Sequence, residues 1–453
     1  MKLRSFEVSE LHGYINSSVT FHDGITFLTG ANGTGKTSIL KLIENLLAPS
    51  ISGLAQTRFS HARASIEISQ NKSFDIVAEN KDKLVVYFSD SKSEIFSFDS
   101  IDKNEWKILS EDQSKLSDYA ERLQVKYSKH PIIERISSIP APVILGTDRE
   151  HRATDDIETD SWEGLLTSRS RELRHARRLM NANLTSTLSD TRQLVKQAFR
   201  IARKREQNAS SSLARSIVAS SFFYADSASL AAPLDFISED KRREILDKRE
   251  QITISLKESN LLDSEINSEI ESFFSKIENI FSKLPDKMSP KFIDENPSLF
   301  SEWIFNRAQI DRLEKLISKI EEQNEKISNY YGTINKFLDL VNYFFKDSNK
   351  KVAIDPVGNI YFQIQGNQEA RPIDQLSSGE KQILIIFSHA LFNSFTSKSR
   401  VLIIDEPELS MHLGWQECFV EKILEGCGEM QVILATHSPE IIGEYFDCAA
   451  FLG

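Results

Sequence analysis

A glycine-rich segment near the amino terminus, G-A-N-G-T-G-K-T over residues 30–37, has the residue types and spacing of a phosphate-binding loop. Its three glycines allow the backbone to curl, so that its N–H groups can point at phosphate oxygens. Lys36 adds a positive charge, and the Thr37 hydroxyl is suited to hold Mg²⁺. The residues predicted to bind a nucleotide through its phosphates are Gly30, Ala31, Asn32, Gly33, Thr34, Gly35, Lys36, Thr37 and Ser38.

A second group of chemistry-bearing residues follows the apolar run over residues 401–404. Asp405 and Glu406 end this run, which is typical of a buried strand that carries acids at its carboxyl edge. Asp405 is suited to hold Mg²⁺, and Glu406 is suited to polarise or deprotonate an attacking water. The run over residues 431–435 also predicts a buried strand, and His437 follows its end. At that position the histidine is expected to contact a terminal phosphate.

Elements of two kinds must position these residues. The phosphate-binding loop follows a strand-like run over residues 24–28 and opens into a helical pattern over residues 39–47. The motif L-S-S-G-E-K-Q over residues 376–382 precedes an apolar helical run over residues 383–392. A helix that starts in this way presents free N–H groups and the positive end of its dipole, which suits a phosphate.

These four motifs, in this order along the chain, resemble the ABC-type ATPase head. A long helical insertion between the phosphate-binding loop and residues 376–382 resembles the branch that contains SMC, RecF and OLD proteins. The resemblance covers about residues 1–150 and 350–453. It implies an α/β fold, with an antiparallel β lobe beside the ATP-binding head and an all-α coiled-coil insert.

The resemblance also implies roles for individual residues. Thr37 and Asp405 would hold Mg²⁺, Glu406 would activate the water, and His437 would be the switch histidine. The segment over residues 408–413 matches the part of the head that lines the dimer seam, although Gly414 stands where many relatives have proline. The residues that would reach across to the nucleotide of a second subunit are Ser377, Ser378, Gly379 and Glu380. For the glutamine of the family's Q-loop, Gln70 and the turn at residues 146–149 both stay open.

We expect three parts along the chain: a first part of the head over residues 1–153, a helical insert over 154–347 and a second part of the head over 348–453. Alternating apolar residues in the first part predict strands over 2–8, 18–21, 25–28, 64–68, 73–78, 83–88 and 95–98. A further strand is expected within 140–149, and two more over 351–354 and 359–364.

The insert carries a heptad pattern that runs from Ile310 to Val341, with Asn324 at one core-type position. The helical stretch over residues 241–281 is its expected partner, and the proline-rich segment over 283–297 would form the hairpin tip. An antiparallel coil of roughly 40 residues would extend about 60 Å. An ordinary long helix in a bundle remains the alternative.

A basic segment over residues 168–206 contains eleven Lys and Arg residues against three acids, although the whole chain has a net charge of −11. The segment Arg169–Arg205 would suit a DNA backbone or an acidic partner. A solvated helix face with ion pairs to acidic helices is an equally good reading. Because the chain as a whole is acidic, uniform DNA binding over its surface is not expected.

The composition, 40% hydrophobic and 27% charged, is typical of a globular protein. With no apolar run long enough for a membrane span, no apolar leader and three unpatterned cysteines, we expect a reducing, cytoplasmic location and no zinc site.

We expect no Toprim domain after the histidine motif. No paired-acid nuclease motif is visible in the printed sequence, and the expected coil tip has no Cys-x-x-Cys. The profile resembles the stand-alone ATPases of anti-phage systems of the Septu and PARIS kind. This resemblance implies an ATPase that uses ATP and Mg²⁺, forms oligomers through its nucleotide sites and controls a separate nuclease or toxin. A RecF-like DNA-repair ATPase is the alternative. A transporter ATP-binding subunit is the least favoured interpretation, because transporter heads are compact and a long helical insert would be out of place in them.

Overall fold

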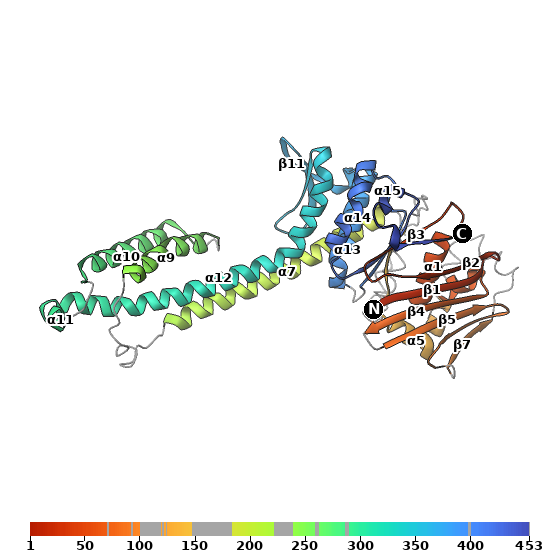
Figure 1. Cartoon of the computed structure of the whole chain (residues 1–453), viewed down its shortest axis with the longest axis horizontal. Coiled ribbons are helices and arrows are strands. Elements are labelled where there is room, and N and C mark those ends of the chain that lie inside the picture. Colours follow the sequence, from red (N-terminus) through yellow and green to blue (C-terminus); the bar gives the residue numbers. More distant parts are fainter. Residues whose placement is uncertain are drawn as a thin grey trace. The chain divides into compact units, whose positions relative to one another are not determined.

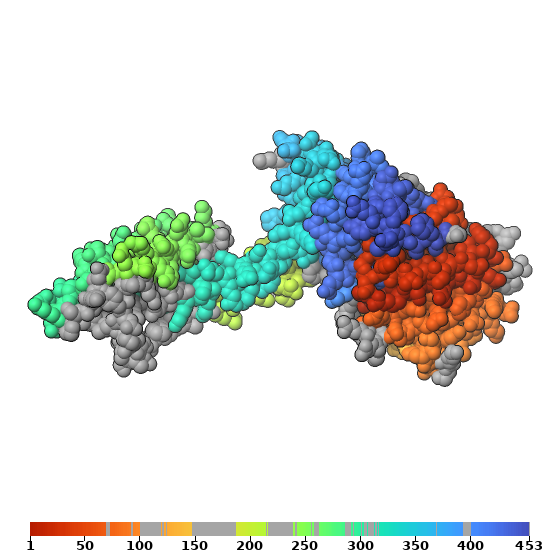
Figure 2. All heavy atoms as spheres, in the orientation of Figure 1, coloured from red at the N-terminus to blue at the C-terminus, as the bar shows by residue number. Residues whose placement is uncertain are grey.

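The structure, a computed structural model, describes residues 1–69, 72–91, 94–99, 119, 122–123, 125–146, 184–221, 239–258, 262–285, 290–396 and 400–452. Two compact units divide the chain. The first contains Met1–Ala198 and Ile334–Gly453, and the second is Phe199–Thr333. The two ends of the chain, red and blue in Figures 1 and 2, therefore belong to one body.

A five-stranded sheet forms the centre of the first unit, and all of its paired strands are parallel. Four of its strands are buried along their whole length, as expected for strands covered on both faces. Because these strands run in the same direction, their carboxyl ends meet at one edge of the sheet. The strand order is β14 (Ala449–Phe451), β3 (Ile25–Thr29), β13 (Gln431–Ala435), β12 (Val401–Asp405) and β8 (Val143–Leu145).

An antiparallel sheet of six strands forms the β lobe (Figure 1). Buried and exposed residues alternate along β6 and β7, as in a sheet with one face on a core. That core includes side chains from helices α1 (Lys36–Leu47), α2 (Ile51–Gln56) and α5 (Pro131–Ser137). The strand order is β2 (Ile15–Thr20), β1 (Lys2–Leu11), β4 (His61–Ser69), β5 (Lys72–Asn80), β6 (Lys83–Phe88) and β7 (Ile95–Asp99).

The carboxyl-terminal third adds a small antiparallel sheet and three helices to the first unit. The sheet contains β9 (Lys350–Ile354), β10 (Ile360–Ile364) and β11 (Asn367–Pro372). The helices are α13 (Ser378–Thr396), α14 (Leu413–Cys427) and α15 (Pro439–Ile442). Short 3₁₀ turns lie at Lys346–Ser348, Ile373–Gln375 and Phe446–Cys448. The predicted α/β class with an antiparallel β lobe and a helical insert is confirmed, whereas β11 and β14 are strands that the sequence pattern did not predict.

The second unit consists of helices among the residues that the structure describes. Figure 1 shows α9 (Glu239–Glu258) and α10 (Ser264–Lys283) side by side, with the short α11 (Pro290–Glu295) nearby. The heptad pattern lies on α12 (Pro297–Phe345), and α7 (Leu184–Ser221) accompanies it. None of the described helices has a long enough apolar stretch to cross a membrane.

The predicted partner of the heptad helix was only partly right. Ile317 packs against Ile252 and Phe274, which belong to the expected stretch. That stretch is not one helix, however, because Asp263 accepts a hydrogen bond from the N–H of Ile266 and so caps a new helix. Farther along α12, Tyr331 donates a hydrogen bond to Glu206 (2.6 Å), so α7 is a second partner of the same helix.

The two units divide within the long helices, at Ala198 and Ile334, whereas the predicted boundaries lie at residues 154 and 347. Residue 154 is outside the described residues. At the second boundary, the last turns of α12 belong to the first unit, where Phe337 stacks with Phe392 and Phe344 with Phe387. Polar bonds also fix the start of α7 there, from Thr191 to Ser388 and from Arg192 to Asp374.

Candidate nucleotide site

The phosphate-binding loop joins β3 to α1 at the carboxyl edge of the central sheet. Gly35 caps α1 in the left-handed region, with φ of 89°. The positive φ is what requires glycine here, and a Cβ at this position would also lie 2.8 Å from the Cδ1 atom of Ile15, so that side chain would have to move. The predicted strand–loop–helix context of the motif is therefore present.

Lys36 lies in the middle of the site, with its side chain directed back over the loop. Its Nζ atom donates to the carbonyl oxygens of Gly30 (2.9 Å) and Ala31 (3.2 Å) and to Nδ1 of His437 (3.3 Å). Burial lowers the pKa of the Lys36 ammonium, and the neighbouring carboxylates of Glu406, Asp405 and Glu408 oppose that shift. The cation is thus fixed where an incoming phosphate oxygen could replace the carbonyl acceptors.

Thr37 and Asp405 come together across the sheet edge, as the sequence predicts. The Thr37 hydroxyl donates to Oδ2 of Asp405 (2.8 Å), and Asp405 is 2% exposed. Its Oδ1 atom is buried and has no hydrogen-bond partner among the described residues. An unsatisfied carboxylate oxygen beside a hydroxyl is a donor set that suits Mg²⁺, so these two residues fit the ion implied by the sequence.

Asp405 has a pKa raised to about 6, because burial disfavours its charged form and Glu406 adds repulsion, against the hydrogen bond from Thr37. Its folded-state pKa therefore lies above its unfolded value, so the native state binds more protons between about pH 4 and pH 6. Asp405 accordingly costs the metal-free protein stability as the pH rises through this window, on the order of 3 kcal/mol by neutral pH.

We expect Asp405→Asn to raise the free energy of unfolding of the metal-free protein at pH 7.5. The gain should shrink towards pH 4, because a protonated aspartate is neutral like asparagine. Denaturant unfolding in EDTA, at several pH values, checks this difference between the variant and the unmodified chain. A loss of stability that is equal at every pH would contradict the assignment of Asp405 as an uncompensated buried carboxylate.

Glu406 and His437 face each other across the same edge. Nε2 of His437 lies 3.8 Å from Oε1 of Glu406. Because Lys36 donates to Nδ1, the neutral imidazole carries its proton on Nε2, on the side of Glu406. The backbone of Glu406 is in the left-handed region (φ 47°), and its N–H bonds to the carbonyl oxygen of Ala435 at 2.7 Å. The structure thus brings Lys36, Thr37, Asp405, Glu406 and His437 into one cluster.

Glu408 is a member of this cluster whose role the sequence did not reveal. Its Oε1 atom accepts from the backbone N–H of His437 (2.7 Å), which ties the loop after β12 to the loop after β13. Its Oε2 atom is buried without a hydrogen-bond partner among the described residues. The sequence pattern assigned chemistry to the adjacent acids Asp405 and Glu406. The spacing of the residues gave no sign that Glu408 bonds to the backbone of residue 437.

We expect Glu408→Ala to slow nucleotide hydrolysis by roughly 10-fold, because the loss of a charge-assisted hydrogen bond frees the loop that carries His437. Glu408→Gln keeps an acceptor oxygen at the same place and should retain most of the activity. Rates at saturating nucleotide compare the two variants. Equal loss in both would show that the charge of Glu408, and not its bond to His437, is what the site needs.

The motif over residues 376–382 lies at the start of α13. Ser377 and Ser378 are exposed, whereas Gly379 and Glu380 are buried. Ser377 and Glu380 hydrogen-bond to each other, and Glu380 also accepts from Lys350. The exposed serines are thus available to a second copy of the chain, while the side chain of Glu380 is directed into its own subunit.

Some predicted residues lie outside the described part of the chain. They include Gln70 and residues 147–149, so the two choices for the Q-loop stay open, although Gly146 is described and half-buried. The first part of the basic segment, with Arg169, Arg171, Arg174, Arg177 and Arg178, is also outside. Its second part, from Arg192 to Arg205, lies on α7.

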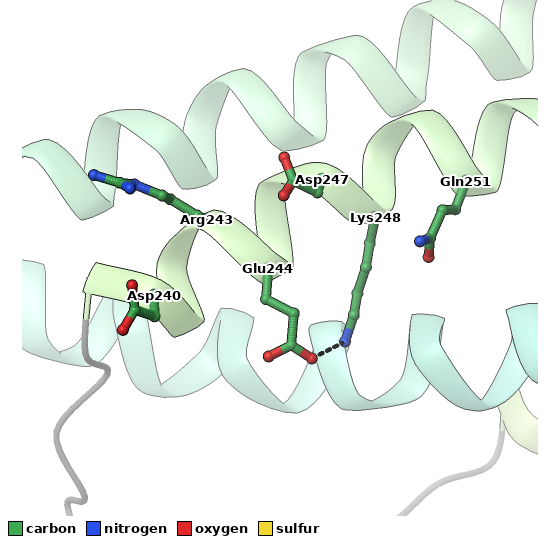
Figure 3. A pocket seen from close by; sticks show the side chains of 6 residues that line it. All are labelled: Asp240, Arg243, Glu244, Asp247, Lys248 and Gln251. Carbon is green, nitrogen blue, oxygen red and sulfur yellow. Dashed lines mark ion pairs between the residues drawn. The ribbon is translucent and has the colours of Figure 1, made fainter.

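A polar groove of about 410 Å³ in the second unit is unrelated to this cluster. Figure 3 shows that all six side chains labelled there project from one helix, α9, with an ion pair between Lys248 and Glu244 (3.7 Å). Acidic and basic groups are interspersed along it, which is typical of a solvated helix face. The residues that line it are Asp240, Arg243, Glu244, Asp247, Lys248 and Gln251.

Two relatives described as probable ATPases share part of this sequence. The retron Ec83 probable ATPase of Escherichia coli is 28% identical over 143 residues, which cover 28% of this chain and 26% of that protein. The retron Vc95 probable ATPase of Vibrio cholerae is 28% identical over 166 residues, 32% of each chain. The matched part thus spans about a quarter to a third of these relatives.

Among solved structures, the chain is similar to SMC head domains. The Pyrococcus furiosus head with an extended coiled coil, bound to the carboxyl-terminal domain of ScpA, is 12% identical with a TM-score of 0.40, over 97% of this chain and 90% of that one. The Thermotoga maritima head is 11% identical with a TM-score of 0.34, over 99% and 92%.

The family comparison covers most of the chain. The AAA ATPase domain family matches residues 1–442, a region that contains all the members of the nucleotide cluster. Together with the motif order, this match confirms the ABC-type ATPase that the sequence predicts. The chain belongs to the AAA ATPase domain family.

Proposed function

We propose that this protein is a Mg²⁺-dependent ATPase that converts ATP and water to ADP and phosphate, in a site completed by a second copy of the chain. The observation that carries the proposal is the cluster at the sheet edge, where a cation, a hydroxyl–carboxylate pair and a carboxylate–imidazole pair converge. Few other reactions need all of these groups around one glycine-rich loop.

Each group has a place in this reaction. The N–H groups of the loop and Lys36 bind the phosphates, and Thr37 with Asp405 would hold Mg²⁺, which would supply positive charge beside the phosphates. Glu406 takes a proton from the attacking water, and the Nε2 proton of His437 is available to the terminal phosphate or to Glu406. The exposed Ser377 and Ser378 act on the nucleotide of the second copy, at the positive end of helix α13.

Phosphate release from ATP by the purified protein tests the reaction. We expect turnover with Mg²⁺ and none in EDTA, and turnover per subunit should rise with protein concentration because two copies form the site. Turnover that does not change on dilution would contradict the shared site, and no phosphate release at any concentration would contradict the ATPase.

We also propose a defence role, in which ATP binding controls a separate effector such as a nuclease, within the cytoplasm. The partial similarity to the retron ATPases supports this role. The test is phage plating on bacteria that carry the gene with its neighbouring genes. We expect protection that is lost with Lys36→Ala, and a stable complex between this chain and a neighbouring product. The absence of both a complex with a neighbouring product and protection against phage would contradict the defence role.

Direct DNA binding is the second candidate, and the described part of α7 favours it. Arg200, Arg203 and Lys204 are exposed, and the last two follow Arg200 by three and four residues, which places each of them beside it on the helix surface. Such a stripe fits the spacing of backbone phosphates, and binding would weaken steeply with salt. We expect the unmodified chain to bind DNA, Arg200→Glu with Lys204→Glu to abolish that binding, and the matched pair Lys315→Glu with Lys319→Glu on α12 to retain it. A chain that binds no DNA would contradict this candidate.

A further inference from the structure

The turn that precedes α13 is held tightly within its own subunit. A Cβ atom on Gly379 would lie 2.2 Å from the carbonyl oxygen of Ser410, so this glycine packs directly on the loop that follows Glu408. The two serines before it are nevertheless exposed. The turn therefore has a buried base, Gly379 and Glu380, and an exposed tip, Ser377 and Ser378. Contacts that fix the base also fix the position of the two serines.

Glu380 fixes the base of this turn through a capping box. The N–H of Ser377 donates to Oε2 of Glu380 (2.8 Å), and the N–H of Glu380 donates to the Ser377 hydroxyl (3.4 Å). Glu380 is only 3% exposed, which is unusual for a capping glutamate on a helix surface. A carboxylate so deeply buried needs a cation beside it.

Lys350 supplies that cation from a different element. Its Nζ atom donates to both carboxylate oxygens of Glu380, at 2.9 and 2.8 Å. Asn349, in the left-handed region with φ of 52°, ends the 3₁₀ turn after α12 and directs the chain into β9. The ring of Phe362 lies 5.5 Å from the ammonium, so the lysine is held on both sides.

The charge of Glu380 is retained in this environment. Burial would favour its neutral form, but Lys350, the N–H of Ser377 and the hydroxyls of Ser348 and Ser377 outweigh burial and lower its pKa. Removing the Lys350 ammonium would leave a buried, unpaired carboxylate, which either becomes protonated or turns towards water. In both cases the bond that fixes the N–H of Ser377 is weakened.

We propose that Lys350 is a positioning residue for ATP hydrolysis, which acts through Glu380 on the Ser377–Gly379 turn and thereby on the nucleotide of a second copy. The inference rests on the proposed function, since it needs a site shared between two subunits. It adds a residue that lies outside all four motifs, at the point where the helical insert returns to the head.

The variants that test it keep the fold as intact as the structure allows. Lys350→Met retains an apolar stem against Phe362 and removes the charge, and Lys350→Arg restores the charge. Lys351→Ala, on the next and exposed residue of the same strand, is the matched control. We expect Lys350→Met to lower kcat at least 10-fold with little change in the ATP affinity of its own loop, and Lys350→Arg and the control to remain near wild type.

Mixed assemblies then separate action across the seam from action within the subunit. Lys350→Met subunits have an intact phosphate-binding loop, and Lys36→Ala subunits have an intact Ser377–Gly379 turn. An equimolar mixture of the two inactive variants should recover about a quarter of wild-type turnover, because half the dimers are mixed and each has one complete site. A mixture of Lys36→Ala with Ser377→Arg is the positive control.

Recovery in both mixtures supports the proposal. Recovery only with Ser377→Arg would overturn it and leave the shared site standing, since Lys350 would then matter to its own subunit. No recovery in either mixture would overturn the shared site and the proposal with it. Wild-type turnover by Lys350→Met alone would also overturn it.

Discussion

Replacing Glu406 with glutamine is expected to reduce ATP turnover by about 100-fold or more, because a glutamine cannot accept the proton of the attacking water. ATP binding should persist, since Lys36, Thr37 and Asp405 remain in place. The change is nearly isosteric, and Glu406 is half-buried at the end of a fully buried strand. Single-turnover measurements of phosphate release, with binding measured in parallel, check both parts.

Two comparisons make this prediction specific. Glu444→Gln, at an exposed carboxylate outside the cluster, should leave turnover unchanged. Normal turnover in Glu406→Gln would mean that another group takes the proton. Loss of ATP binding in that variant would mean that Glu406 supports the loop instead of the reaction.

The second large effect is expected from Lys36→Ala, which should reduce ATP affinity by at least 100-fold, since a fixed cation at the phosphates is lost. The Lys36 ammonium also bonds to Nδ1 of His437, so the variant should leave that imidazole free to change tautomer. Equilibrium binding of a fluorescent ATP analogue measures the affinity, and the melting temperature reports whether the fold survives.

Lys81→Ala is the control for this variant, because Lys81 is exposed in the turn between β5 and β6. It should bind ATP as the unmodified chain does. If Lys36→Ala bound ATP with unchanged affinity, the glycine-rich loop would not be a nucleotide site at all, and the proposals that depend on it would fail.

Much of the head could be predicted from the sequence, because its signals are local. Alternation identified the strands of the β lobe, and apolar runs identified the buried strands β3, β12 and β13. Two strands escaped for physical reasons. The sequence of β11, N-Q-E-A-R-P, is polar and ends in proline at the sheet's edge, and β14 is only three residues long.

The helical insert shows where periodicity is insufficient. A heptad pattern indicates that α12 has an apolar seam, but it does not identify which helix covers that seam. Ile317 is covered from α9 and α10, whereas Tyr331 meets Phe199 and Glu206 on α7. The break at Asp263 was visible as a capping residue, yet a single Asp in a helical pattern is too common a signal to divide a helix.

The residues of the nucleotide cluster also differ in how far the sequence could predict them. Its members that belong to motifs were predicted, since strand ends in a parallel sheet must meet at one edge. Glu408 accepts a hydrogen bond from the backbone N–H of His437, and Lys350 donates to the buried carboxylate of Glu380. Those partners lie 29 and 30 residues away, and only the fold brings them together.

The central claim is that ATP joins two copies of the chain, and its most direct test is the molar mass of Glu406→Gln with and without ATP, measured by light scattering. We predict that ATP raises the mass by forming a stable assembly. Adding Ser377→Arg to this variant should prevent that rise while ATP binding remains. A molar mass that stays constant with ATP fully bound would contradict the claim. An equal rise in mass when Ser377→Arg is present would also contradict it.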